Sequence, residues 1–318
     1  SELYASKTFA NTAKDFLSLV QWINKLTGSA KSLRFVMEAT GVYHEAFAYF
    51  LDEHGLEVSI ILPNKISNYA RSLDTKTVTD KTASEAIVLF GLERKLDRWT
   101  RPNTLFKTLS QLSRERSQII AERTVLKNQL HAEKAQAIPY KRSIERIKKR
   151  ILLLDKQEKD IVHELKSLVK TDEEVKAKIK LMCSLSGIGF LTAVTVLAET
   201  DGFNMIRNKR QLTSYAGLDV KEKQSGTSVK GKARISKKGN RHLRKAMHLP
   251  ALAAIKHDER FKAIFIRLVS KHGIKMKAVV AVQRKLLEMM YILCKTATAY
   301  DKNYLNKSAM EIVADEKN

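Results

Sequence analysis

Two apolar runs with heptad spacing, between residues 105 and 168, constrain the fold of this chain most strongly. The first run consists of Leu105, Leu109, Leu112, Ile119, Leu126 and Leu130. After a break at 138–139, the second consists of Ile144, Ile147, Ile151, Leu154, Ile161, Leu165 and Leu168. Alternating steps of three and four keep one face of a helix apolar, so the runs predict two long helices that pack as an antiparallel coiled-coil hairpin.

Charged residues interrupt the apolar seam of both runs. Arg116 and Arg123 occupy seam positions in the first run, and Glu158 occupies one in the second. Arg116 and Glu158 lie about equally far from the break, so they could pair across the hairpin. Charges on a seam favour a specified register or a partner helix over maximal stability. A plain spacer and a dimerisation arm are both compatible with this pattern.

The first hundred residues alternate between strand and helix patterns. Residues 33–38 and 56–62 read as strands, with an amphipathic helix over 42–53 between them. This βαβ order predicts a parallel pair with a right-handed crossover. Glu38 ends the first strand, where α/β sheets place ligands, and Asp80 opens a helix that runs to Glu93.

Residues beyond 170 read as a series of helices. Thr171 and Glu174 have capping-box spacing, and further helices are predicted over 208–218, 241–257 (interrupted by Pro250), 260–269 and 276–297. A Gly-x-Gly turn at Gly187 and Gly189 separates two of them. Such a helix-hairpin-helix presents backbone N–H groups to a phosphate. An ordinary tight turn between helices is the alternative.

Residues 229–245 carry eight Lys or Arg and no carboxylate, with Ser236 in their midst. Unpaired charges are costly to bury, so this segment must face solvent or a polyanion. A serine in such a field could attack a phosphodiester, because nearby cations favour the alkoxide. Spacing alone favours a plainer interpretation, in which a solvated loop leads into a helix and Ser236 is its N-cap.

The charge of the whole chain favours nucleic acid as the partner. Its 58 Lys and Arg outnumber 34 Asp and Glu, which gives a formal net charge of +24. A membrane surface is the competing explanation, but the sequence has no apolar run of about 18 residues and no secretory signal pattern. Cys183 and Cys294 lie in apolar helical patterns, which indicates a reducing cytoplasm. The histidines are scattered and predict no zinc site.

Several motifs in this order resemble the transposases and recombinases of the insertion-sequence 110 family, which includes the Piv-type DNA invertases. They are Phe9-Ala-Asn-Thr, Met37-Glu-Ala-Thr-Gly-Val-Tyr43, Thr79-Asp-Lys, Leu185-Ser-Gly-Ile-Gly189, Ser214-Tyr-Ala-Gly-Leu218, Ser225-Gly-Thr-Ser and Ile235-Ser-Lys-Lys-Gly239. The resemblance extends over nearly the whole chain. It implies a ribonuclease-H-like, RuvC-like α/β domain over 1–100, a coiled-coil arm over 101–170, a helical transposase domain over 171–300 and a polar tail over 301–318.

The resemblance also implies a chemistry. Glu38 and Asp80 become the second and third members of an Asp-Glu-Asp-Asp set that binds Mg²⁺, and Ser236 becomes the nucleophile joined transiently to a DNA phosphate. Family members act as homodimers or homotetramers with a structured bridge RNA, which places the protein at the nucleoid of the bacterial cytoplasm. The residues expected to hold DNA are Lys230, Lys232, Arg234, Lys237, Lys238, Arg241, Arg244, Lys245, Gly187 and Gly189.

The chain departs from the family pattern at two of the four acids. The strand that carries the first Asp should precede Phe9, and it is absent from this chain. Ala83 stands three residues after Asp80, where the fourth Asp should be. Fewer carboxylates attract a hard cation less. We therefore expect a recombinase, or alternatively a truncated or decayed copy that binds nucleic acid without catalysis. A RuvC-like resolvase is disfavoured, because it needs the full acidic set.

Overall fold

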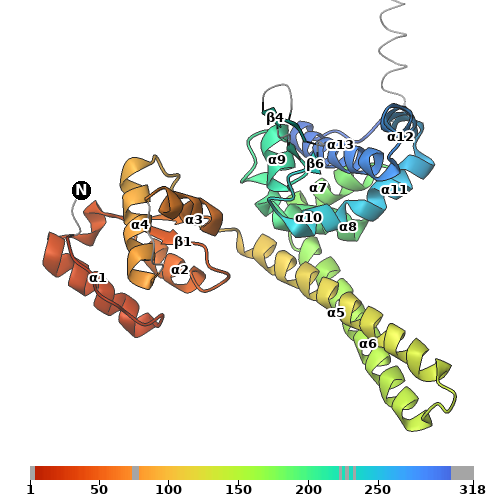
Figure 1. Ribbon diagram of the computed structural model, residues 1–318, viewed down its shortest axis with the longest axis horizontal. Coiled ribbons are helices and arrows are strands. Elements are labelled where there is room, and N and C mark those ends of the chain that lie inside the picture. The colour runs from red at the N-terminus through yellow and green to blue at the C-terminus, as the bar shows by residue number, and fades with distance from the viewer. Residues whose placement is uncertain (1–3, 74–78, 222–223, 226–228, 232–233, 302–318) are drawn as a thin grey trace, which may run out of the picture. The chain divides into compact units, whose positions relative to one another are not determined.

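The computed structural model describes residues 4–73, 79–221, 224–225, 229–231 and 234–301, and it divides into two compact units (Figure 1). The first unit is Ser1–Arg101 and the second is Pro102–Asn318. The predicted polar tail and Lys232 lie outside the described residues, apart from Asp301. Within the described part of the chain, no helix combines the length and the apolar character needed to cross a membrane.

The first unit contains the predicted βαβ order. Strands β1 (Arg34–Glu38) and β2 (Glu57–Ile61) pair in parallel, with Glu38 opposite Ile61 at the carboxyl end. Helix α2 (Glu45–Glu53) connects them. It starts later than predicted, because Gly41 has a positive φ of 55° and residues 41–44 form a turn. The remaining elements are α1 (Ala13–Thr27), a short 3-10 helix (Ala30–Ser32), α3 (Pro63–Ser72) and α4 (Asp80–Glu93).

Helix α4 has the predicted bounds, and its start has a clear local cause. The Thr79 hydroxyl accepts a hydrogen bond from the Thr82 amide at 3.2 Å, and the Thr82 hydroxyl accepts one from the Thr79 amide at 2.9 Å. This reciprocal cap satisfies two donors that a helix start leaves unpaired. Further along, Gly91 packs against β1, where an added Cβ would lie 3.0 Å from Cγ2 of Val36. Close packing therefore seats the end of α4 on β1.

In the second unit, helices α5 (Thr104–Ala135) and α6 (Lys141–Lys170) form the predicted antiparallel helical hairpin (Figure 1). The predicted pair across the seam is present, with Nη2 of Arg116 2.6 Å from Oε1 of Glu158. Arg123 also contacts Glu158, and it lies 2.7 Å from Oδ1 of Asp155. Three of these charged side chains are mostly buried, so register is fixed by charge as well as by apolar packing.

The rest of the second unit is mostly helical. Its helices are α7 (Glu173–Cys183), α8 (Phe190–Glu199), a 3-10 helix (Asp201–Phe203), α9 (Lys209–Tyr215), α10 (Arg241–Ala246), α11 (His248–His257), α12 (Glu259–His272) and α13 (Lys275–Thr296). They share one hydrophobic core with the hairpin, and Met182, Leu212, Met247 and Leu286 are fully buried in it.

One predicted detail of these helices is wrong, and another is confirmed. Helix α7 is capped by Asp172, whose carboxylate accepts the Val175 amide at 3.0 Å, and not by Thr171 with Glu174. The predicted interruption within 241–257 is present, because α10 ends at Ala246 and α11 starts at His248, with Pro250 in its first turn. A proline is tolerated there, since the first N–H groups of a helix have no partner within it.

Candidate active site

Ser236 lies at the end of a short antiparallel ribbon. Strand β3 (Val220–Lys221) pairs with β6 (Arg234–Ile235), and Val220 lies opposite Ile235. This register places Ser236 beside Asp219, and the Ser236 amide donates to the Asp219 carbonyl at 2.8 Å. The Ser236 hydroxyl donates to Oδ1 of Asp219 at 2.5 Å. Both residues are half-buried.

A hydroxyl bonded to a carboxylate is the arrangement of a nucleophile with its proton acceptor. The same Ser236 oxygen accepts the Lys238 amide at 3.3 Å, a donor that would stabilise negative charge on that oxygen. Sequence reasoning missed Asp219, because it precedes Ser236 by 17 positions and only the pairing of β3 with β6 brings them together. The available signal was an acid directly after Ser214-Tyr-Ala-Gly-Leu218.

The expectation that Ser236 caps a helix is wrong. Helix α10 is capped by Asn240, whose side-chain oxygen accepts the amides of His242 at 2.8 Å and Leu243 at 3.2 Å. Between Ser236 and this cap the backbone is tightly constrained. Lys237 has a φ of 52°, and Gly239 has a φ of 149°.

Gly239 is required by the space around it as well as by its φ. An added Cβ would lie 2.4 Å from the carbonyl oxygen of Tyr215, closer than any side chain tolerates. Arg244 helps to hold the same loop, because its Nη1 donates to the carbonyls of Ala216 at 2.8 Å and Gly239 at 3.1 Å. Its guanidinium therefore binds the loop itself, and its expected contact with DNA stays a prediction.

Several other predicted DNA contacts lie at the surface around Ser236. The exposed side chains are Arg234, Lys237, Lys238, Arg241 and Lys245. They come from β6, the loop and α10, and they carry only positive charge. Lys230 belongs to β5 (Val229–Lys230), which pairs with β4 (Gln224–Ser225); its backbone alone is described. This surface is suited to a polyanion that approaches the serine.

The Gly187–Gly189 turn connects α7 to α8, as expected. Gly187 has a φ of 88° and packs against α11, where an added Cβ would lie 2.5 Å from the Pro250 carbonyl oxygen. This close approach explains the glycine by packing. Gly189 is the exposed residue that precedes α8. The phosphate-binding role of both glycines stays a prediction.

The predicted acid site lies in the first unit. Glu38 ends β1, and its Oε1 accepts the Thr40 hydroxyl at 3.3 Å. Asp80 is exposed in the first turn of α4, and Ala83 follows one turn later without an oxygen to offer. Among the described residues, no group of three or more His, Cys, Asp and Glu side chains could hold a metal ion.

The described residues form only part of the expected divalent-metal site. Mg²⁺ is usually held by one or two carboxylates together with waters and substrate phosphates. Of the acids that the resemblance implies, the described residues offer Glu38 and Asp80, and Ala83 stands where a further acid was expected. Binding of Mg²⁺ at Glu38 and Asp80 stays a prediction.

Comparison with known proteins covers both units. A family model described as "Transposase IS116/IS110/IS902 family" matches residues 179–265, and a DEDD-type IS110 transposase model matches residues 1–137. The "Pilin gene-inverting protein" of Moraxella bovis is 28% identical over 304 residues, which is 93% of this chain and 90% of that protein. Its Moraxella lacunata counterpart matches to the same extent. The "Transposase for insertion sequence element IS1111A" of Coxiella burnetii is 28% identical over 147 residues, 44% of this chain and 38% of that protein.

Proposed function

Because the chain belongs to the IS110 family of transposases, we propose that Ser236 is its nucleophile and forms a transient ester with a DNA phosphate. The chain is thus a DNA transposase or recombinase in which the cutting and rejoining step takes place in the second unit. The observation that supports this proposal best is the 2.5 Å hydrogen bond from the Ser236 hydroxyl to Oδ1 of Asp219.

The proposed step balances in atoms and charge. The Ser236 hydroxyl transfers its proton to Asp219 as its oxygen attacks the phosphorus of a DNA phosphodiester. A new bond forms between phosphorus and the serine oxygen, and the bond from phosphorus to one sugar oxygen breaks. The departing sugar oxygen takes up a proton from solvent and leaves as a hydroxyl. In the reverse sequence, a hydroxyl of the strand to be joined attacks the ester and releases Ser236, so rejoining needs no ATP.

The charge around Ser236 suits this chemistry. A phosphodiester and its transition state are anionic, and exposed Lys237, Lys238 and Arg241 lie beside the serine in sequence. The Lys238 amide already donates to the serine oxygen at 3.3 Å. Asp219 is a carboxylate within this basic surface. A role as proton acceptor for the Ser236 hydroxyl explains its presence there.

Trapping the ester tests the proposal. The substrate is nicked duplex DNA from the flanks of the encoding gene, with RNA transcribed from the same flanks, so that a released fragment diffuses away and the ester accumulates. We expect a protein–DNA complex that survives denaturing electrophoresis. Ser236→Ala should abolish it, and Ser214→Ala, a matched change at an exposed serine of the same region, should leave it intact. An equal yield of complex from Ser236→Ala would refute the proposal.

A nucleic-acid-binding protein without catalysis is the second candidate function. The composition of the acid site favours it, because Ala83 supplies no ligand and the described residues contain no cluster of three acids. Binding of the nicked substrate with no covalent complex under any condition would favour this candidate. Salt dependence does not separate the two, since both predict a steep loss of affinity with ionic strength.

The finer features that the resemblance carries are also proposals. They comprise a RuvC-like fold for residues 1–100, a coiled-coil dimerisation arm over 101–170, and a transposase domain over 171–300. They further comprise a bridge RNA, a homodimeric or homotetrameric assembly, and association with the nucleoid. The basic surface around Ser236 and the charged seam of the hairpin support nucleic-acid binding and a specified helical register, respectively.

A further inference from the structure

We propose that Glu199 is a positioning residue, which ties the helical hairpin to the segment that carries Ser236. The proposal rests on the proposed role of Ser236 for its importance to the reaction, though not for its geometry. It connects three parts of the second unit that are far apart in the sequence: the first turns of α5, the end of α8, and the loop before α10.

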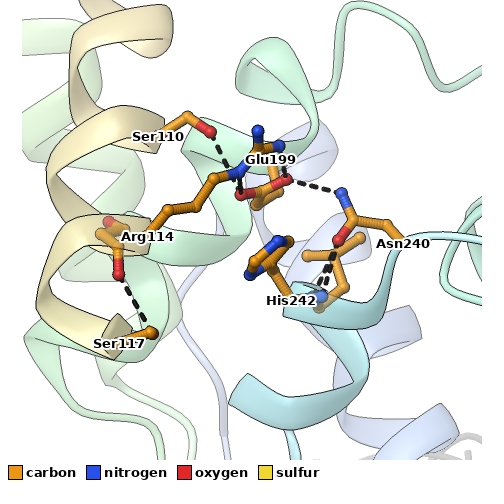
Figure 2. Close-up of polar contacts among 8 residues, drawn as sticks. Ser110, Arg114, Ser117, Glu199, Asn240 and His242 are labelled. Atoms are coloured by element: carbon orange, nitrogen blue, oxygen red, sulfur yellow. Dashed lines mark hydrogen bonds and ion pairs between the residues drawn. The ribbon is translucent and has the colours of Figure 1, made fainter. Parts of the chain in front are cut away.

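The Glu199 carboxylate is buried, with a side chain only 1% exposed, and four hydrogen bonds surround it (Figure 2). From α5, the Ser110 hydroxyl donates to Oε1 at 3.1 Å. Arg114 donates from Nε to Oε1 at 2.7 Å and from Nη2 to Oε2 at 2.8 Å. On the other side, the Asn240 amide group donates to Oε2 at 2.6 Å. A buried carboxylate with this many donors has little freedom to shift.

Asn240 links the Glu199 carboxylate to the loop that carries Ser236, residues 236–240. Its side-chain oxygen caps α10, its side-chain nitrogen binds Glu199, and its backbone amide donates to the Tyr215 carbonyl at 2.7 Å. Only three residues separate it from Ser236, and Gly239 among them has a backbone that no other residue fits. Because the loop between them is short and constrained, a displacement of Asn240 should also displace Ser236.

The other end of the network is one face of α5. Asn103, Phe106, Ser110 and Arg114 are spaced by three or four residues, so they lie on one side of the helix. The Asn103 amide donates to Asp201 at 3.1 Å, and Phe106 lies against Gly202, where an added Cβ would approach its ring to 2.5 Å. The base of the hairpin is thus docked along α8 and the turn after it, and Ser110 and Arg114 are the residues of that face that contact Glu199.

Ionisation of Glu199 is consistent with this role. Burial acts to raise the pKa of Glu199, but the hydrogen bonds from Arg114 and Asn240, together with the positive charges of Arg114 and His242, bring the pKa below its usual range. Burial lowers the pKa of neighbouring His242, against the pull of Glu199, and the positive charges of Arg114, Arg241 and Lys245 lower it further. At neutral pH the network is centred on the Glu199 carboxylate, which Arg114 and Asn240 hold.

A thiol at position 236 can report how the loop presents that side chain, in a measurement that does not depend on catalysis. In a Ser236→Cys background, alkylation by iodoacetamide measures how the loop presents that side chain. The native cysteines give a low background, because burial raises the pKa of Cys183 and raises that of Cys294 to about 11. The perturbation is Asn240→Ser, which keeps a capping oxygen for α10 and removes the donor to Glu199.

Asn208→Ser is the matched control, because Asn208 caps α9 by accepting the Gln211 amide at 2.9 Å and does not contact Glu199. We expect Asn240→Ser, and independently Ser110→Ala, to raise the alkylation rate by about threefold or more as the loop is released. Asn208→Ser should leave the rate unchanged. Equal rates in Asn240→Ser and Asn208→Ser, with both variants folded by circular dichroism, would overturn the proposal.

The same variants with Ser236 intact separate this inference from the proposed function. A changed alkylation rate with no covalent DNA complex in any variant, including the parent protein, supports the positioning role and counts against the nucleophile. A changed rate together with a reduced yield of complex in Asn240→Ser supports both. An unchanged alkylation rate refutes the positioning role whatever the activity.

Discussion

Replacement of Asp219 by asparagine should abolish most of the chemistry while leaving DNA binding intact. The amide has the shape of the carboxylate and can still accept the Ser236 hydroxyl bond of 2.5 Å, but it cannot take the proton. Loss of a general base of this kind lowers a rate by about 10²- to 10⁴-fold. At 1.36 kcal/mol per tenfold, this corresponds to about 3–5 kcal/mol of activation free energy.

The affinity of Asp219→Asn for DNA should not fall with the rate. Asp219→Asn removes a negative charge from a surface that faces a polyanion, so DNA binding should be unchanged or tighter. The two effects are measured separately, by the single-turnover rate of ester formation on the nicked substrate and by a binding isotherm at fixed salt. Glu259→Gln is the control, because Glu259 is an exposed carboxylate on α12 that pairs with Lys262.

A rate for Asp219→Asn within about threefold of the parent would contradict the assignment of Asp219 as proton acceptor, since a missing base costs at least a hundredfold in rate. A parallel loss of rate and affinity would also contradict it, because that pattern indicates a damaged fold. Circular dichroism and the thermal midpoint decide whether the fold is intact. A rate lost with affinity kept is the outcome that the geometry predicts.

Three further predictions concern stability. Glu158→Ala leaves Arg116 without its seam partner, and we expect it to lower stability by about 3 kcal/mol and the thermal midpoint by about 6–12 °C; an unchanged midpoint would show that the pair contributes nothing. Gly187→Ala, at a φ of 88° against α11, should cost at least about 1 kcal/mol, which chemical denaturation would detect. Folding lowers the pKa of Glu199, so its ionised form stabilises the protein at pH values above the unfolded pKa of about 4.3. This stabilisation is lost as the pH falls through the pKa of Glu199 in the folded protein. The gap in thermal midpoint between the parent and Glu199→Gln should therefore narrow on acidification from neutral pH, and a gap that widens would contradict the sign.

The sequence predicted those parts of the fold that depend on neighbouring residues or on a simple hairpin register. Asp80 signals a helix start as an acid at the N-terminal end, and α4 begins there. Counting outward from the break in the heptads paired Arg116 with Glu158, and the two side chains meet at 2.6 Å. In both cases the relevant partners lie close in sequence or are related by a simple hairpin register.

Only part of the serine site could be predicted, because its partners are far apart in the sequence. Ser236 stood out through the charge around it, but its proton acceptor arrives through strands only two residues long, which leave no periodic signal. The cap at Asn240 was missed because Ser236 also has a capping side chain, and the competition is decided by Gly239 and Tyr215 in three dimensions. Glu199 gave no signal at all, since it ends an apolar helix and its partner Arg114 lies 85 positions away.

The location of the covalent bond is the most direct evidence for or against Ser236 as the nucleophile. Tandem mass spectrometry of the trapped, nuclease-trimmed and protease-digested complex identifies the residue that carries the nucleotide. We expect a nucleotide phosphate on Ser236, in a peptide that ends near Lys237, and no such mass in Ser236→Ala or in a reaction without DNA. A nucleotide attached to any other residue, or a complex whose Ser236 peptide is unmodified, would show that Ser236 is not the nucleophile.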